Sequence, residues 1–131
     1  ALRSALPRVA RVVGAGGSGL NPEIRGGGPI EACRQALKRA GMTMDQIDLV
    51  EINEAFACQV IGSAKHLGID IDRQLNIHGG AIALGHPFGM TGSRIMTTLI
   101  NGLQWEDKTY GLESMCVGGG QGLAMVIERL S

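Results

Sequence analysis

The sequence predicts a layered α/β domain with a mixed, mostly parallel sheet of about five strands and helices packed on it. Segments typical of strands alternate with amphipathic helical segments in the order βαβα(β)αββ. The last two strand segments are joined by a glycine run, which is typical of an antiparallel connection. The chain has 131 residues, 44% of them apolar, so we expect one domain with its own core.

The first strand and helix are predicted from apolar spacing and helix stop signals. Residues 8–14 mix valine with small and basic residues, which predicts a strand. Pro29 is well placed as a first helical residue and Gly41 as a C-terminal stop, so we expect a helix over residues 29–40. Cys33 lies on its apolar face and is expected to be buried.

A second strand and helix follow. Residues 47–52 predict a buried strand, and residues 54–67 predict a helix that ends before Gly68. Cys58 also lies inside this helix and is expected on a buried face. The polar face of the helix, which we expect to be solvated, carries Gln59, Ser63 and His66.

The C-terminal half combines a long loop with a final strand pair. A short strand segment around Leu75 precedes a loop over residues 76–89. Residues 90–103 predict a largely apolar helix that should be buried on most sides. Residues 111–117 and 123–129 predict two strands joined by the glycine run between them.

Residues 14–19, GAGGSG, match the G-x-G-x-x-G pattern of dinucleotide-binding loops. That fingerprint requires a helix directly after its last glycine, whereas Pro22 and the glycines at 26–28 follow here. We therefore reject a nucleotide site and interpret the glycines as a loop in which the backbone approaches its neighbours closely.

Charge and hydropathy exclude several classes of protein. Twelve basic residues balance twelve acidic ones, and the few aromatic residues are scattered, which argues against nucleic-acid binding. The longest apolar run, residues 123–127, is far too short to cross a membrane. No signal segment is visible, and the three cysteines lack a disulfide framework. We expect a reducing compartment, the cytoplasm, with an organelle still open because the true N-terminus is expected to lie outside this sequence.

Polar residues gather where the predicted strands end, which is where open α/β sheets bind ligands. Asn53 ends the second strand, and Cys116 stands at the strand exit before the glycine run. His86 lies between Gly85 and Pro87, ahead of a helix start that disfavours an imidazolium. A neutral imidazole is a usable base or donor, and a thiol near free backbone N–H groups can act as nucleophile or proton carrier.

Each of these residues also has a structural interpretation. Asn53 is typical of a helix N-cap, His86 of a tight turn, and Cys116 of a buried strand. A metal site made by His78, His86 and Cys116 matches no zinc spacing and has no acidic companion. We therefore set the metal site aside and expect His78 to orient its neighbours in the loop.

Three ordered blocks resemble the signature blocks of the thiolases, which make or cleave 3-ketoacyl-CoA thioesters. They are residues 53–57 (NEAFA), 76–87 (NIHGGAIALGHP) and 116–122 (CVGGGQG). The GPI at residues 28–30 also resembles the family. The resemblance covers nearly the whole chain and implies a thiolase-type C-terminal catalytic domain over residues 1–131.

The resemblance implies a role for each matching residue. His86 would activate the acyl-accepting cysteine and help to form one oxyanion hole, together with a water held by Asn53. Cys116 would move a proton to or from the substrate. The backbone N–H of Gly118 would belong to the other oxyanion hole, and Phe56 would line the acyl pocket. Coenzyme A thioesters are the implied substrates, with no permanently bound cofactor.

The chain departs from the family in one respect, because the acylated cysteine of thiolases lies in an N-terminal half that is not matched here. Neither Cys33 nor Cys58 has the context of an acylation motif. We expect that half as a partner, a homo-oligomer in the full enzyme, and an isolated domain without activity. Two other interpretations stay open: a non-catalytic binding or assembly module, and a stand-alone acyl-thioester hydrolase, which needs Cys116 and His86 within hydrogen-bond reach.

Overall fold

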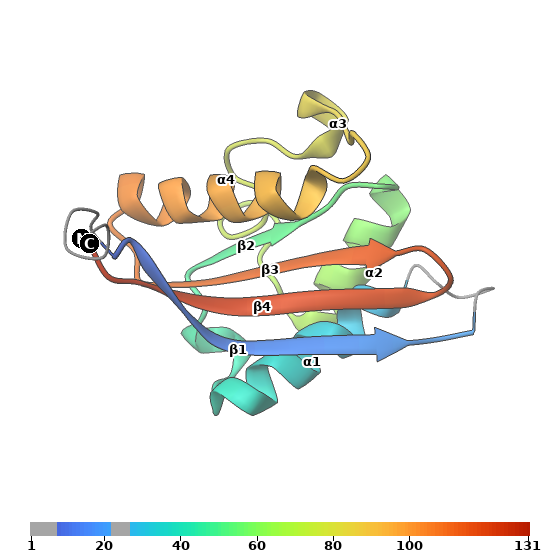
Figure 1. Ribbon diagram of the computed structural model, residues 1–131, viewed down its shortest axis with the longest axis horizontal. Helices are drawn as coiled ribbons and strands as arrows, with labels where there is room; N and C mark the ends of the chain where they lie inside the picture. The colour runs from blue at the N-terminus through green and yellow to red at the C-terminus, as the bar shows by residue number, and fades with distance from the viewer. Residues whose placement is uncertain (1–7, 22–26) are drawn as a thin grey trace, which may run out of the picture.

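A four-stranded sheet runs through the domain, with helices on both faces (Figure 1). The computed structural model describes residues 8–21 and 27–131. Of the predicted features, Pro22 and the first glycine of residues 26–28 lie outside these residues. The elements are β1 (Ala10–Gly19), α1 (Gly28–Ala40), the short 3-10 helix η3 (Met44–Gln46), β2 (Leu49–Ile52), α2 (Ala57–Leu67), α3 (Ala81–Leu84), α4 (Thr91–Trp105), β3 (Tyr110–Val117) and β4 (Gln121–Arg129).

The sheet has the strand order β1-β4-β3-β2. β2 pairs parallel with β3, whereas β4 pairs antiparallel with both β3 and β1. β1, β2 and β3 therefore run in one direction and β4 is reversed, which confirms the mixed sheet and the antiparallel final pair. The short segment around Leu75 adds a parallel bridge to Val50 at the β2 edge.

The glycines after residue 14 form a strand, so the expected loop over residues 14–19 is wrong. β1 continues through them and pairs with β4 as far as Gly19 and Gln121. The close approach of α1 explains why these strand positions are glycine. A Cβ on Gly14 would lie 2.6 Å from the Ala36 carbonyl oxygen, and a Cβ on Gly16 would clash with the backbone of α1. The glycines thus serve helix packing.

The helices begin and end close to the predicted positions. Gly41 and Gly68 take left-handed conformations after α1 and α2. α2 begins later than predicted, at Ala57, because Phe56 is extended. α4 buries one face only, so its expected burial on most sides is wrong. It covers the β2 and β3 part of the sheet and turns Ser93, Thr97 and Gln104 outward. The predicted loop contains α3, an apolar run too short to show helical periodicity.

The orientation of α2 differs from the prediction. Gln59 and Ser63 are buried, with 8% and 1% of their surface exposed, whereas His66 is exposed. The buried face of α2 consists of Gln59, Val60, Ser63 and Ala64, a continuous i, i+3, i+4 stripe. Cys58 lies off this stripe and is exposed, which corrects its expected burial.

Two apolar clusters lie on opposite faces of the sheet. The larger one joins α1 and α2 to the sheet and includes the buried Cys33, as predicted. The smaller one joins α4 to the sheet through Leu49, Leu99, Leu103 and Ile127. In the described part of the chain, no helix is both long and apolar enough to cross a membrane.

The α4 face of the sheet is only half covered. Val12 pairs with Ile127, and Leu123 lies four residues from Ile127 along β4, so both side chains point to the α4 face. They are 58% and 48% exposed. α4 reaches β4 at Ile127, but no described helix covers Val12 or Leu123 on this β1 and β4 half of the face.

Candidate active site

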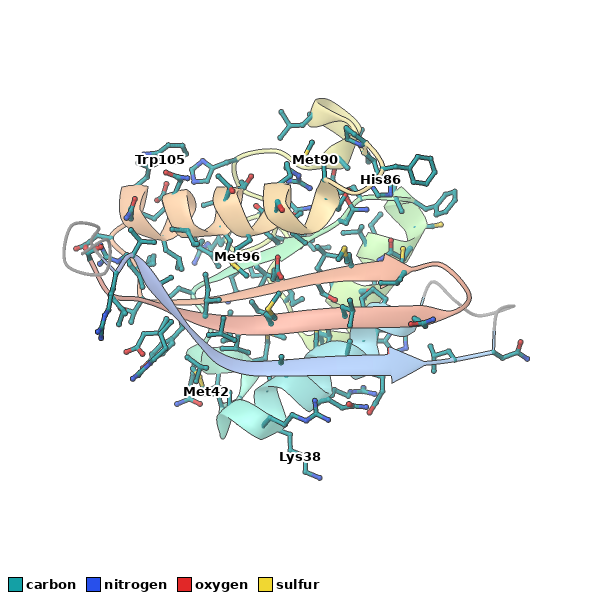
Figure 2. All side chains as sticks on the ribbon, in the orientation of Figure 1. Lys38, Met42, His86, Met90, Met96 and Trp105 are labelled. Carbon is teal, nitrogen blue, oxygen red and sulfur yellow. The ribbon has the colours of Figure 1, made fainter. Side chains whose placement is uncertain are left out.

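The candidate residues meet at the carboxyl ends of β2 and β3, beside the first turn of α4. Asn53 directly follows β2, and Cys116 is the residue before the last in β3. His86 lies on the loop between α3 and α4, and Figure 2 shows it close to the end of β3. The predicted gathering of polar residues at strand ends is therefore present in the structure.

His86 is held at both ring nitrogens. Asn53 Nδ2 lies 3.4 Å from Nε2, and Thr91 Oγ1 lies 2.6 Å from Nδ1. When the Asn53 amide donates to Nε2, Nδ1–H donates to Thr91; when the amide is rotated, Oδ1 accepts from Nε2–H and the Thr91 hydroxyl donates to Nδ1. Asn53 and Thr91 are both buried, so the exposed ring stands on a fixed support.

Thr91 is a site residue that the sequence reasoning missed. It is the first residue of α4, a position where a hydroxyl residue passes as an ordinary helix start. The signal that could have found it was its place five residues after His86, across a glycine turn that brings the chain back to the ring.

Two more missed residues, Glu54 and Asn76, join the first two signature blocks. The Asn76 side chain accepts the N–H of Ile52 and donates to its carbonyl oxygen, each at 2.9 Å, and also donates to Glu54 Oε1 at 2.9 Å. Glu54 Oε2 accepts the N–H of Ile82 at 2.9 Å. Glu54 therefore ties the end of β2 to α3 and to the loop that carries His86.

Cys116 faces two hollows that share the same wall. One of about 410 Å³ lies toward α4 and is lined by His86, Thr91, Cys116 and Gly118, among others. The other, of about 320 Å³, lies toward α2 and has Phe56, His86, Cys116 and Gly118 in its lining. The structure thus brings together all the residues predicted for the site. No hydrogen bond joins His86 to Cys116 in the described chain.

Gly118 begins the turn between β3 and β4. The last pair before it is Val117 with Gln121, so the N–H of Gly118 lies outside the β3–β4 ladder. Gly119 and Gly120 have φ of 79° and 84°, a region that favours glycine. The turn therefore needs its glycines and presents backbone beside Cys116.

His78 lies at the other end of α4. Its ring meets Trp105 edge to face at 5.1 Å, and its Nε2 lies 3.8 Å from Glu106. Figure 2 shows Trp105 and His86 at opposite ends of that helix. The structure therefore does not bring His78 to His86 and Cys116, and the metal site that these three residues would form is not assembled.

Comparisons with known proteins give a consistent result. A family model described as "Thiolase, C-terminal domain" matches residues 6–129. The acetyl-CoA acetyltransferase of Escherichia coli (strain K12) is 49% identical over 131 residues, which cover 100% of this chain and 33% of that protein. The 3-ketoacyl-CoA thiolase of Photobacterium profundum is 53% identical over 123 residues, 92% of this chain and 32% of that protein.

A solved structure matches as well. The crystal structure of the Bacillus anthracis acetyl-CoA acetyltransferase superposes with a TM-score of 0.93 at 41% identity, covering 98% of this chain and 32% of that one. The chain therefore spans about a third of the length of the relatives it matches.

Proposed function

The chain belongs to the thiolase family, whose C-terminal domain it matches, and on this basis we propose that it is the C-terminal catalytic part of an acyl-CoA C-acyltransferase. The enzyme forms or cleaves 3-ketoacyl-CoA by covalent acyl transfer and serves fatty-acid metabolism. The observation that carries the proposal is His86, which is held by Asn53 and Thr91 and lines the same hollows as Cys116 and Gly118. Its substrates are coenzyme A thioesters, and it holds no permanent cofactor.

His86 acts on the acyl-accepting cysteine. With Nδ1–H donating to Thr91, Nε2 gives up its long contact with Asn53, 3.4 Å, and takes the thiol proton of that cysteine. The thiolate attacks the thioester carbonyl, and the coenzyme A thiolate leaves and takes that proton back from the imidazolium. Negative charge on the carbonyl oxygen needs fixed donors, which are the His86 ring and a water held by the Asn53 amide. The geometry supports this role because a ring held at both nitrogens keeps its direction.

Cys116 moves a proton to or from the α-carbon of the second substrate. Its partly buried thiol lines both hollows, so a substrate carbon in either hollow lies on the side of the thiol. The N–H of Gly118, outside the strand ladder, stabilises the enolate oxygen. Phe56 lines the acyl side of the site.

The remaining part of the enzyme supplies the nucleophile. We propose that an N-terminal thiolase half covers the open β1 and β4 face, because the relatives are about three times longer than this chain and this face exposes Val12 and Leu123. The full enzyme is a homo-oligomer in the cytoplasm. The three cysteines, all free in the structure, support a reducing compartment.

The stand-alone hydrolase is not favoured, because it needs Cys116 within hydrogen-bond reach of His86 and no hydrogen bond links these two residues in the described chain. A non-catalytic module is not favoured either, because the site residues are assembled in one place.

The test is a chimera in which this chain replaces the matching C-terminal third, 33%, of the E. coli acetyl-CoA acetyltransferase. We expect thiolysis and condensation from the chimera and none from the 131-residue chain alone. His86→Ala should abolish acylation of the chimera, while Cys116→Ser should keep acylation and lose α-proton exchange into deuterated solvent. A folded but inactive chimera, or turnover by the chain alone, would contradict the proposal.

A further inference from the structure

The position of the His86 ring depends on two elements at once. Asn53, which bonds to Nε2, belongs to the end of β2, and Thr91, which bonds to Nδ1, is the first residue of α4. A shift of α4 relative to β2 by a fraction of an ångström therefore moves the two partners apart. A contact that fixes α4 relative to β2 therefore also affects how the His86 ring is held.

A buried ion pair lies next to Asn53 and Thr91 along the two elements. Arg94 Nη1 is 3.3 Å from Glu51 Oε2. Arg94 lies three residues after Thr91 on α4, and Glu51 lies two residues before Asn53 along β2, so each member sits next to one support of the ring.

The Arg94–Glu51 ion pair is directional, whereas the rest of the contact between α4 and the sheet is apolar. Around it, α4 meets the sheet through aliphatic side chains such as Leu49, Leu99 and Leu103, whose attraction is not directional. The side chains of Arg94 and Glu51 are only 11% and 4% exposed, so salt and water screen their attraction little. In the described chain, this pair is the charged contact between α4 and β2.

The surroundings of the pair are rich in carboxylates. Glu113 is buried and lies beside Glu51 in the β2–β3 register. One carboxylate oxygen of Glu113 and one guanidinium nitrogen of Arg94 have no hydrogen-bond partner in the described chain. Burial raises the pKa of Glu51 to about 7, although Arg94 opposes this; Glu54 and Glu113 raise it further. Burial also raises the pKa of Glu113 to about 7. Glu51 therefore lies near one cation, Arg94, and two other carboxyl groups, those of Glu54 and Glu113.

We infer that Arg94 and Glu51 are positioning residues for His86: their buried pair fixes α4 against β2, and thereby selects one orientation and one hydrogen-bonding state of the imidazole. The inference rests on the proposed function only for the catalytic use of the ring, since the geometry stands without it.

The test reads the imidazole directly, by nitrogen-15 NMR of the 131-residue chain. Long-range proton–nitrogen correlations distinguish Nδ1–H from Nε2–H, a His86→Gln variant assigns the signals, and His66 and His78 serve as internal references. We expect one dominant tautomer in the parent chain. In Glu51→Gln and in Arg94→Met we expect the minor tautomer to rise at least about threefold, which corresponds to a lost hydrogen bond of ordinary strength.

The double variant Glu51→Gln/Arg94→Met separates positioning from stability. It removes both charges of the pair, so neither member is left without the other, and it should recover most of the stability lost in Arg94→Met, while His86 should keep its mixed tautomers. The matched control is Arg129→Gln, which removes the ion pair between Arg129 and Asp107 beyond the other end of α4 and should leave His86 unchanged.

Three outcomes would overturn the inference: mixed tautomers already in the parent, an unchanged His86 in both single variants, or recovery of the parent tautomer together with stability in the double variant. An inactive chimera with a single parent tautomer would instead contradict the proposed function alone. In an active chimera, kcat of the double variant should fall about tenfold with KM nearly unchanged.

Discussion

Individual residues at this site depend on partners that are distant in sequence. His86 is 33 residues from Asn53, and the two meet because β2 ends where the loop before α4 returns. Thr91 completes the arrangement from the buried side. Side chains held by such second contacts lose little orientation between turnovers.

Removal of the Thr91 hydroxyl tests this support. Thr91→Val keeps the shape of the side chain but removes its hydrogen bond to His86 Nδ1. We expect the acylation rate of the chimera to fall about five- to tenfold, as for one lost hydrogen bond of about 1 kcal/mol. Thr97→Val is the control, because that hydroxyl bonds only to the Ser93 carbonyl oxygen on the outer face of α4. Equal rates for the two variants would remove Thr91 from the site.

The three cysteines should differ in reactivity. Cys33 is buried, and burial raises the pKa of its thiol to about 11, so almost no thiolate forms at about pH 8. Cys58 is exposed and Cys116 partly so. We expect iodoacetamide to modify Cys58 and Cys116 in the folded chain and all three cysteines in urea, as read by peptide mass spectrometry. Modification of Cys33 in the folded chain at the rate of Cys58 would contradict its buried state.

Among the elements, the packing of α1 against β1 explains the glycine run. Gly16→Ala would place a Cβ against the backbone of Ala32, whereas Gly19 has nothing within 4 Å. We expect Gly16→Ala to lower the free energy of unfolding by about 2–3 kcal/mol, and Gly19→Ala, in the same strand, to change it by less than about 0.5 kcal/mol. Urea unfolding measures both. Similar values for the two variants would mean that α1 does not approach β1 this closely.

The neighbouring strands β2 and β3 make stability depend on pH. The pKa values of Glu51 and Glu113 are raised to about 7 in the folded chain, against 4.5 for an ordinary glutamate. Between these values the unfolded chain has released protons that the folded chain still binds, so stability falls as pH rises from about 5 through about 7 and is level only above about 8.

Glu113→Gln should weaken this pH dependence. The variant keeps the shape of the side chain and removes one of the two carboxyl groups, so we expect a smaller loss of unfolding free energy between about pH 5 and about pH 8. Urea unfolding at several pH values provides the measurement, with the exposed Glu106→Gln as control. Stability that rises over this interval in the parent chain would refute the assignment.

For the domain as a whole, a substitution on the half-covered sheet face should affect the activity of the full enzyme but not the stability of this chain. Leu123 is 48% exposed on this face, so Leu123→Asp should leave the unfolding free energy of the chain alone nearly unchanged. In the chimera the same change should abolish activity, because it buries a charge against the N-terminal half. Ile71→Asp, which is exposed away from this face at 44%, is the control. An active Leu123→Asp chimera would exclude this face as the contact.

The amino-acid sequence was enough to predict the order of the elements, the helix stops at Gly41 and Gly68, the burial of Cys33 and the three blocks that meet at the site. These depend on local signals: apolar period, glycine at helix ends, and residue types at strand exits. Other features became visible only in the folded chain: the glycines of β1 form a strand, α2 buries Gln59 and exposes Cys58, Thr91 holds His86, and Glu51 meets Arg94. Most of these features depend on which face an element turns to a partner far away in the chain, and Thr91 depends on how a loop folds back. Contacts of this kind leave no periodic trace in the order of residues.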